Sequence, residues 1–222
     1  MLMILMYIAN GLIIFAFLWY LLLVILNSNN KFTESDGFNV TKDILSEYDS
    51  INIIENKSIF TVYNLKRKVI KIASKRYYGN SLSDVAIPLM EAGVSANNSK
   101  YLDMLSKILS NLKKLYILPI IIIIVNSVTY SLGDARVAIP LVAICALASY
   151  IIIDIKNCAY IWLDKHINNK LKINKEKTLK FINKIIMIDK LIFFGELLMI
   201  IRFVAIILGI NWGDLWILIW LK

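Results

Sequence analysis

Side chains that could ligate a metal or act as an acid, a base or a nucleophile are few in this 222-residue chain. It has one histidine, His166, and two cysteines, Cys145 and Cys158. The side chains that could surround a cation are Glu91, Asp84, Asp154 and Cys158, although their spacing does not require it. The sequence contains no GxSxG nucleophile motif, P-loop, GxGxxG fingerprint or Cys–His catalytic motif. A common soluble-enzyme chemistry is therefore not indicated.

Two further ionisable residues, Glu196 and Arg202, lie inside the apolar run 191–210. An ionisable residue within a membrane span is a functional candidate, and pairing between helices or at the membrane surface is the alternative. Cys145 and Cys158 are separated by about 20 Å if one helix carries both, which excludes a disulfide between them. We expect both to be small buried residues.

The elements that must position these residues include long apolar segments. The chain is 59% hydrophobic and only 18% charged, whereas a soluble domain has roughly 45–50% apolar and about 25% charged residues. Four apolar runs, 3–26, 115–132, 137–153 and 191–210, approach or reach the length of a membrane span. We therefore expect a mainly α-helical membrane protein with about four transmembrane helices and a small cytosolic α+β domain inserted after the first. The first run has no basic segment before it and no small-residue cleavage site after it, so we expect a retained helix.

The predicted organisation has five parts. They are the transmembrane helix 1–26, the cytosolic domain 27–114, the transmembrane hairpin 115–155, the basic amphipathic cytosolic segment 156–190, and the transmembrane helix with its Trp-rich tail 191–222. Segments 27–114 and 156–190 hold 13 and 9 of the 25 basic residues. An excess of Lys and Arg marks cytoplasmic loops facing anionic lipid, which predicts a multi-pass cell-membrane protein with its polar parts in the cytosol.

Within 27–114 the pattern predicts short elements. A helix over 40–48 would be capped by Asn39 or Thr41, and three β-branched runs, 51–55, 59–63 and 68–72, suit an antiparallel meander. Ser81 or Ser83 could cap a following helix, in which Pro88 fits only the first turn. Apolar side chains at helical spacing predict one more helix over 98–114.

Segment 77–83, Tyr-Tyr-Gly-Asn-Ser-Leu-Ser, follows Tyr-Asn at 63–64 and the strand-like segment 68–74. Together they resemble the YugP-type neutral zinc metallopeptidases of bacterial membranes. The resemblance covers about residues 37–163 and is firmest over 63–101. It implies an N-terminal membrane helix, a β-strand, a helix carrying an HExxH zinc motif, and then a hydrophobic hairpin.

The zinc ligands of that family have no counterparts here. In HExxH, two histidines on one helix face bind zinc and the glutamate activates a zinc-bound water. The ungapped match is Met90-Glu91-Ala92-Gly93-Val94, which puts Glu91 on the general base but Met90 and Val94 on the histidines. A thioether and an isopropyl group cannot replace two imidazoles. The third ligand, a glutamate in the family, falls at 155–157, which reads Ile-Lys-Asn, and the family's turn Asp-Pro is Asn64-Leu65.

The resemblance therefore implies a degenerate metallopeptidase with no bound zinc, in which Glu91 is the only catalytic remnant. We expect a binding or scaffold subunit with a protein partner or a second copy of itself, in which helix 81–96 forms a cleft wall. One alternative is an active metallopeptidase with unconventional ligands. Another is a small multispanning component of a transport or membrane assembly, suggested by Glu196, Arg202 and Asp154. Nucleic-acid binding is disfavoured because the basic residues follow the predicted cytoplasmic loops.

Overall fold

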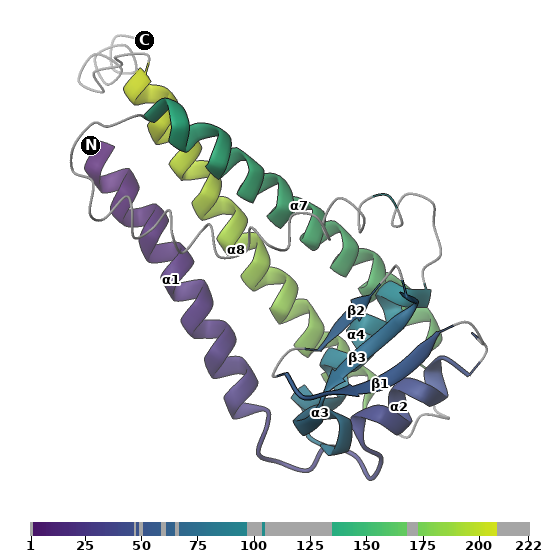
Figure 1. The fold of residues 1–222 in the computed structure, drawn as a ribbon. Coiled ribbons are helices and arrows are strands. Elements are labelled where there is room, and N and C mark those ends of the chain that lie inside the picture. The colour runs from purple at the N-terminus through teal and green to yellow at the C-terminus, as the bar shows by residue number, and fades with distance from the viewer. Residues whose placement is uncertain are drawn as a thin grey trace.

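The computed structural model is mainly helical with one small three-stranded sheet (Figure 1). The structure describes residues 2–46, 48, 51–58, 61–64, 67–96, 104, 135–167 and 173–207. Three long helices, α1 (Leu2–Leu26), α7 (Ala135–His166) and α8 (Lys175–Ile207), run side by side. The sheet and the short helices gather at one end of them. The predicted helix over 98–114, the run 115–132 and the Trp-rich tail lie outside the described residues, apart from a helical Met104.

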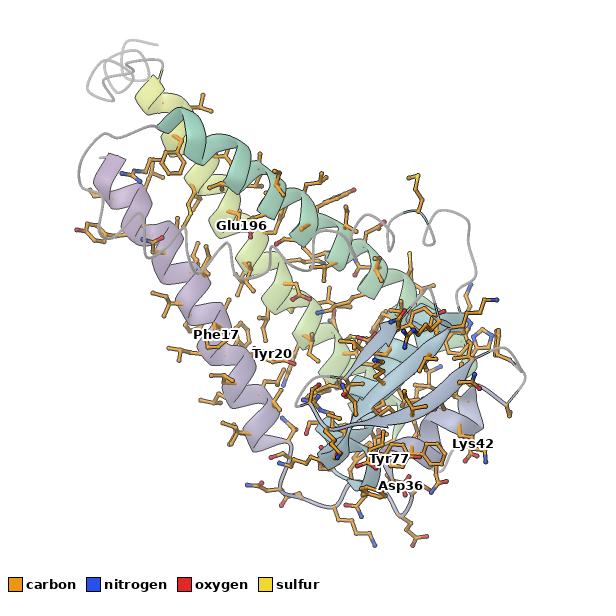
Figure 2. All side chains as sticks on the ribbon, viewed as in Figure 1. Phe17, Tyr20, Asp36, Lys42, Tyr77 and Glu196 are labelled. Carbon is orange, nitrogen blue, oxygen red and sulfur yellow. The ribbon has the colours of Figure 1, made fainter. Side chains whose placement is uncertain are left out.

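Helix α1 confirms the helix predicted for the first apolar run. Its buried side chains, Ala9, Ile13, Ala16 and Leu23, recur every three, four or seven residues and face α8. Tyr20 packs against the core, whereas Phe17 is exposed (Figure 2). Two segments in the described part of the chain, Tyr7–Leu26 and Val142–His166, are long and apolar enough to cross a membrane. Four spans are therefore an expectation that only these two helices support.

The ends of helices α7 and α8 do not coincide with the boundaries between apolar and basic segments in the sequence. The basic segment 156–190, expected to form one amphipathic surface helix, contains the end of α7 and the first half of α8. Helix α8 then continues without interruption through the fourth apolar run as far as Ile207. Lys156 on α7 and Asp189 on α8 form an ion pair of 2.6 Å that joins the two helices. The apolar stripe of 175–190 is buried in the protein core.

The sheet contains the expected strands with a different pairing. Strands β1 (Asn52–Asn56), β2 (Val62–Asn64) and β3 (Val69–Ala73) stand in the order β1-β3-β2. The antiparallel meander is wrong, because β1 pairs with β3 in parallel and only β2 pairs antiparallel. The chain crosses from β1 to the far edge and returns to the centre through a short turn. Lys68 takes a left-handed backbone conformation (φ 48°) as it enters β3.

Three short helices complete the sheet end. Helix α2 (Gly37–Ile44) is capped by Asp36, whose Oδ1 accepts from the Asn39 N–H at 2.7 Å, and not by Asn39 or Thr41 as expected. Helix α3 (Ser74–Tyr78) follows β3 directly, and α4 (Leu82–Ala96) comes next. Pro88 lies well inside α4, beyond the first turn predicted for it. Since proline lacks an N–H, the Asp84 carbonyl four residues earlier has no helical donor.

Helix α4 is the centre of the core. Most of its side chains are buried, and they pack with the inner face of β3, with α2 and with the first half of α8. The main core cluster includes Val40, Ile70, Ile72, Val85, Leu89, Ile182 and Ile186. In the described structure most side chains of helix 81–96, expected to form a cleft wall, are packed in this core.

Candidate functional site

The start of α4 is held by a pair of buried polar residues, Ser81 and Asp84. The Asp84 N–H donates to Ser81 Oγ at 3.2 Å, and Ser81 Oγ donates to Asp84 Oδ2 at 2.6 Å. Ser81 is thus the N-cap, as one of the two sequence alternatives predicted, and the pair is a variant of the capping box. The Asp84 carboxylate therefore has a structural role at the start of α4.

Each residue of the segment that carries the family resemblance has a packing or hydrogen-bonding partner. Tyr77 stacks on Phe38 of α2 with ring centroids 4.6 Å apart. The Tyr78 hydroxyl donates to Glu55 of β1 at 3.0 Å, and this hydrogen bond to a carboxylate raises the pKa of Tyr78. A Cβ at Gly79 would collide with the Asp84 carboxylate and lie 2.5 Å from the Lys75 carbonyl. The segment therefore connects α2, β1 and α4, and these contacts alone account for its residue types.

Glu91, which the resemblance matches to the family's general base, accepts a hydrogen bond from the backbone of an outer strand. Its Oε2 accepts from the backbone N–H of Tyr63 at 2.8 Å. Tyr63 lies in β2, an outer strand of the sheet, so the bond joins the middle of α4 to that strand. Outer strands carry backbone groups with no strand partner, and a carboxylate satisfies such an N–H strongly. Glu91 therefore has a structural contact that links α4 to β2.

The two positions matched to zinc-binding histidines hold apolar side chains in apolar surroundings. Met90 is 5% exposed and belongs to the main core. Val94 packs on a small cluster of Ile151, Ile155 and Cys158 on α7. Position 155 is where the resemblance places the third ligand, so the fold brings position 94 against the cluster that contains position 155. The residues named at both positions are aliphatic.

Gly93 explains how α4 and α7 come so close together. A Cβ at this position would lie 2.9 Å from the Ala159 carbonyl oxygen and 3.1 Å from the Ala159 Cβ. Both distances are too short for an ordinary contact, so a larger side chain would force the helices apart. The glycine that the resemblance aligns with the family motif is here a helix-packing residue.

The remaining candidate ligands do not assemble around a cation. His166 stacks on Trp162 at 4.2 Å, and its Nδ1 lies 2.8 Å from the Trp162 carbonyl oxygen. Both cysteines are free; Cys145 is buried as expected, whereas Cys158 is only partly buried. Across the described ranges, no group of three or more His, Cys, Asp or Glu side chains could hold a metal ion.

Glu196 lies apart from all of these residues, among the long helices (Figure 2). Only 2% of its surface is exposed, although it is an acid within an apolar helix segment. Arg202 lies further along α8, with its guanidinium 5.5 Å from the Phe203 ring centre. The sequence correctly marked Glu196 as unusual. It carried no signal for the Tyr63–Glu91 bond or the Lys156–Asp189 pair, because the partners are 28 and 33 residues apart.

No protein-family model, curated protein or solved structure matches this chain.

Proposed function

We propose that this chain is a catalytically inactive, metallopeptidase-like membrane protein that acts as a binding or scaffold subunit. The observation that carries the proposal is the packing of Val94 against the cluster that contains Ile155, which puts aliphatic side chains at two positions where zinc ligands would be needed. A second support is the carboxylate of Glu91, which accepts the Tyr63 N–H. A hydrolytic zinc needs three protein ligands and an open position for water. Met90 adds only a buried thioether to this region.

The membrane setting belongs to the same proposal. Four helices would cross the bilayer, with the sheet end in the cytosol beside anionic lipid and a protein partner in or at the membrane. Its supports are the two helices of sufficient length and the basic residues in segments 27–114 and 156–190. The apolar outer face of α1, with Phe17, Leu18 and Leu22 more than half exposed, suits contact with lipid.

Rebuilding the lost site tests the metallopeptidase framework directly. The triple substitution Met90→His, Val94→His and Ile155→Glu restores three ligands of the types that the family uses. If the framework is shared, the purified triple variant binds about one zinc per chain, whereas the wild-type protein binds no stoichiometric zinc. Elemental analysis after dialysis without chelator measures both. A matched control, Met90→Gln, Val94→Asn and Ile155→Gln, introduces polar groups that ligate zinc poorly.

The outcomes separate the alternatives. A folded triple variant without zinc would remove the support for the metallopeptidase framework. Stoichiometric zinc on the wild-type chain, together with peptide cleavage that Glu91→Gln abolishes, would establish an active enzyme with unconventional ligands and refute the inactive one. An authentic metallopeptidase assayed in parallel is the positive control for cleavage.

A second candidate function, a component of a transport or membrane assembly, is favoured by the burial of Glu196. Charged groups within apolar helices often mark ion or proton pathways. Neutral substitution of Glu196 would then impair flux or assembly, and unchanged flux and assembly would exclude this role.

A further inference from the structure

Buried polar oxygens interrupt the contact between the three long helices. Glu196 of α8 is 2% exposed, and Asn10 of α1 is 9% exposed. Their surroundings are otherwise apolar, since Ala9, Ile13, Val142, Cys145, Met199 and Phe203 form a core cluster at this level. Polar groups in such a contact need an explanation, because each must exchange its water for another partner.

Three of these oxygens have no hydrogen-bond partner among the residues that the structure describes. Within the described part of the chain, Glu196 Oε1, Glu196 Oε2 and Asn10 Oδ1 are buried acceptors without a donor. Glu196 also forms no ion pair with any described residue. A buried carboxylate without a counter-charge destabilises a fold by several kcal/mol. A bound cation would remove that penalty and satisfy the acceptors.

Helices α7 and α1 both approach α8 near this carboxylate. Ser149 of α7 is the hydroxyl that interacts with Glu196, although the two do not form a hydrogen bond of good geometry, and Cys145 of α7 is near enough to interact with its charge. Helix α1 approaches closely at the preceding residue, because a Cβ at Gly195 would lie 3.1 Å from the Ala9 carbonyl oxygen. The small residues at positions 9 and 195 therefore allow the α1 backbone, and with it Asn10, to come close to this turn of α8.

We propose that the Glu196 carboxylate, the Asn10 amide oxygen and the Ser149 hydroxyl bind a sodium ion between α1, α7 and α8. Oxygen ligands suit hard cations. One carboxylate neutralises a single positive charge, whereas a divalent ion would leave an excess charge buried in an apolar contact. The ion joins α1 to the α7–α8 pair. This inference does not depend on the metallopeptidase-like framework.

Thermal unfolding of the full chain in detergent tests the site. Samples contain sodium chloride or choline chloride at equal ionic strength and fixed pH, and a thiol-reactive dye reports the increase in reactive thiol as the buried Cys145 becomes exposed above the signal of the partly exposed Cys158. Above the dissociation constant, sodium raises the unfolding midpoint by about 3–5 °C for each tenfold increase in concentration. Glu196→Gln and Ser149→Ala abolish or weaken the response. Glu176→Gln, an exposed acid on the same helix, leaves it unchanged.

Each outcome bears on the proposal. Equal midpoints in sodium and choline for the wild-type chain would overturn it, and so would a sodium response that survives both site substitutions. Stabilisation by acidification alone, with no sodium effect, would show that the carboxylate takes a proton and would also overturn it. If Glu196→Gln fails to fold, ²³Na relaxation measurements compare sodium binding by the wild-type and Ser149→Ala proteins. Weaker sodium binding by the variant supports the site, and equal binding refutes it.

Discussion

Replacing Glu91 distinguishes a structural carboxylate from a catalytic one. The Tyr63 N–H bond to Glu91 is 2.8 Å long and half-buried. A hydrogen bond to a charged group contributes about 1.5–3 kcal/mol, and a neutral one about 0.5–1.5 kcal/mol. Glu91→Gln keeps an acceptor oxygen and loses the charge, so we expect it to destabilise the fold by about 1 kcal/mol. Glu91→Ala also leaves the N–H without this acceptor, so we expect about 2–3 kcal/mol.

Two measurements check this order. Chemical unfolding in detergent gives the free energy of unfolding for wild type, Glu91→Gln and Glu91→Ala. Amide hydrogen exchange of the peptide that contains β2 reports the Tyr63 N–H itself, and each 1.4 kcal/mol of lost local stability speeds exchange about tenfold. Glu176→Gln is the matched control, since Glu176 pairs with Lys180 on the exposed surface of α8 and such pairs contribute little.

The result that refutes the structural reading is specific. If Glu91→Ala unfolds at the same free energy as wild type and the Tyr63 amide exchanges at the same rate, the carboxylate does not hold β2. A catalytic or partner-binding role would then be the better account of Glu91. If Glu91→Gln loses as much stability as Glu91→Ala, the negative charge of Glu91, and not its acceptor oxygen, is what stabilises the contact between α4 and β2.

Two further predictions concern helix packing and pH. Gly93→Ala and Gly11→Ala both gain about 1 kcal/mol of helix propensity. The added Cβ would meet Ala159 closely at position 93, whereas at position 11 it would meet nothing within 4 Å. We expect the Gly93 variant to be the less stable of the two by about 1–3 kcal/mol in parallel unfolding curves, and equal stabilities would contradict the close approach of α4 and α7. Tyr78 should ionise at higher pH than an ordinary tyrosine, because its hydroxyl donates to Glu55 and a phenolate would face that carboxylate. The contact stabilises the fold at pH values below the ordinary tyrosine pKa, and this stabilisation is lost as the pH rises through the raised pKa. The difference between spectrophotometric titrations of wild type and Tyr78→Phe should therefore show a tyrosine that ionises at unusually high pH, and Glu55→Gln should abolish that shift.

The sequence predicted the strands but not their pairing, for a physical reason. Period and composition identify a strand, whereas pairing depends on the connections. The links between the three runs lack the two-residue Asn-Gly or Asp-Gly turns that specify a hairpin. Strands β2 and β3 still form an antiparallel hairpin. The connection after Asn56 instead takes the chain from β1 to β2, on the opposite side of β3. A parallel β1–β3 pair therefore forms without a helical crossover.

Those features of the candidate site that depend on residue type or local sequence were predictable. Those that depend on contacts between residues distant in the sequence were not. Residue type alone identified Met90 and Val94 as apolar at the two histidine positions of the motif, and in the structure both pack with other apolar side chains. Ser81 was identified as one of two possible caps because capping is local. The role of Glu91 required the position of β2 relative to α4, which only the folded chain defines.

Helix α8 connects the two regions for which functions are proposed here. Hydropathy divides it near Lys190, because the residues before that point are basic and those after it are apolar. Helix continuity depends instead on the backbone, and no proline interrupts Lys175–Ile207. The first half of α8 contributes Ile182, Ile185 and Ile186 to the core around α4, and the second half carries Glu196. A change in how α1 packs at Glu196 would therefore act on the same continuous helix that supports the sheet end.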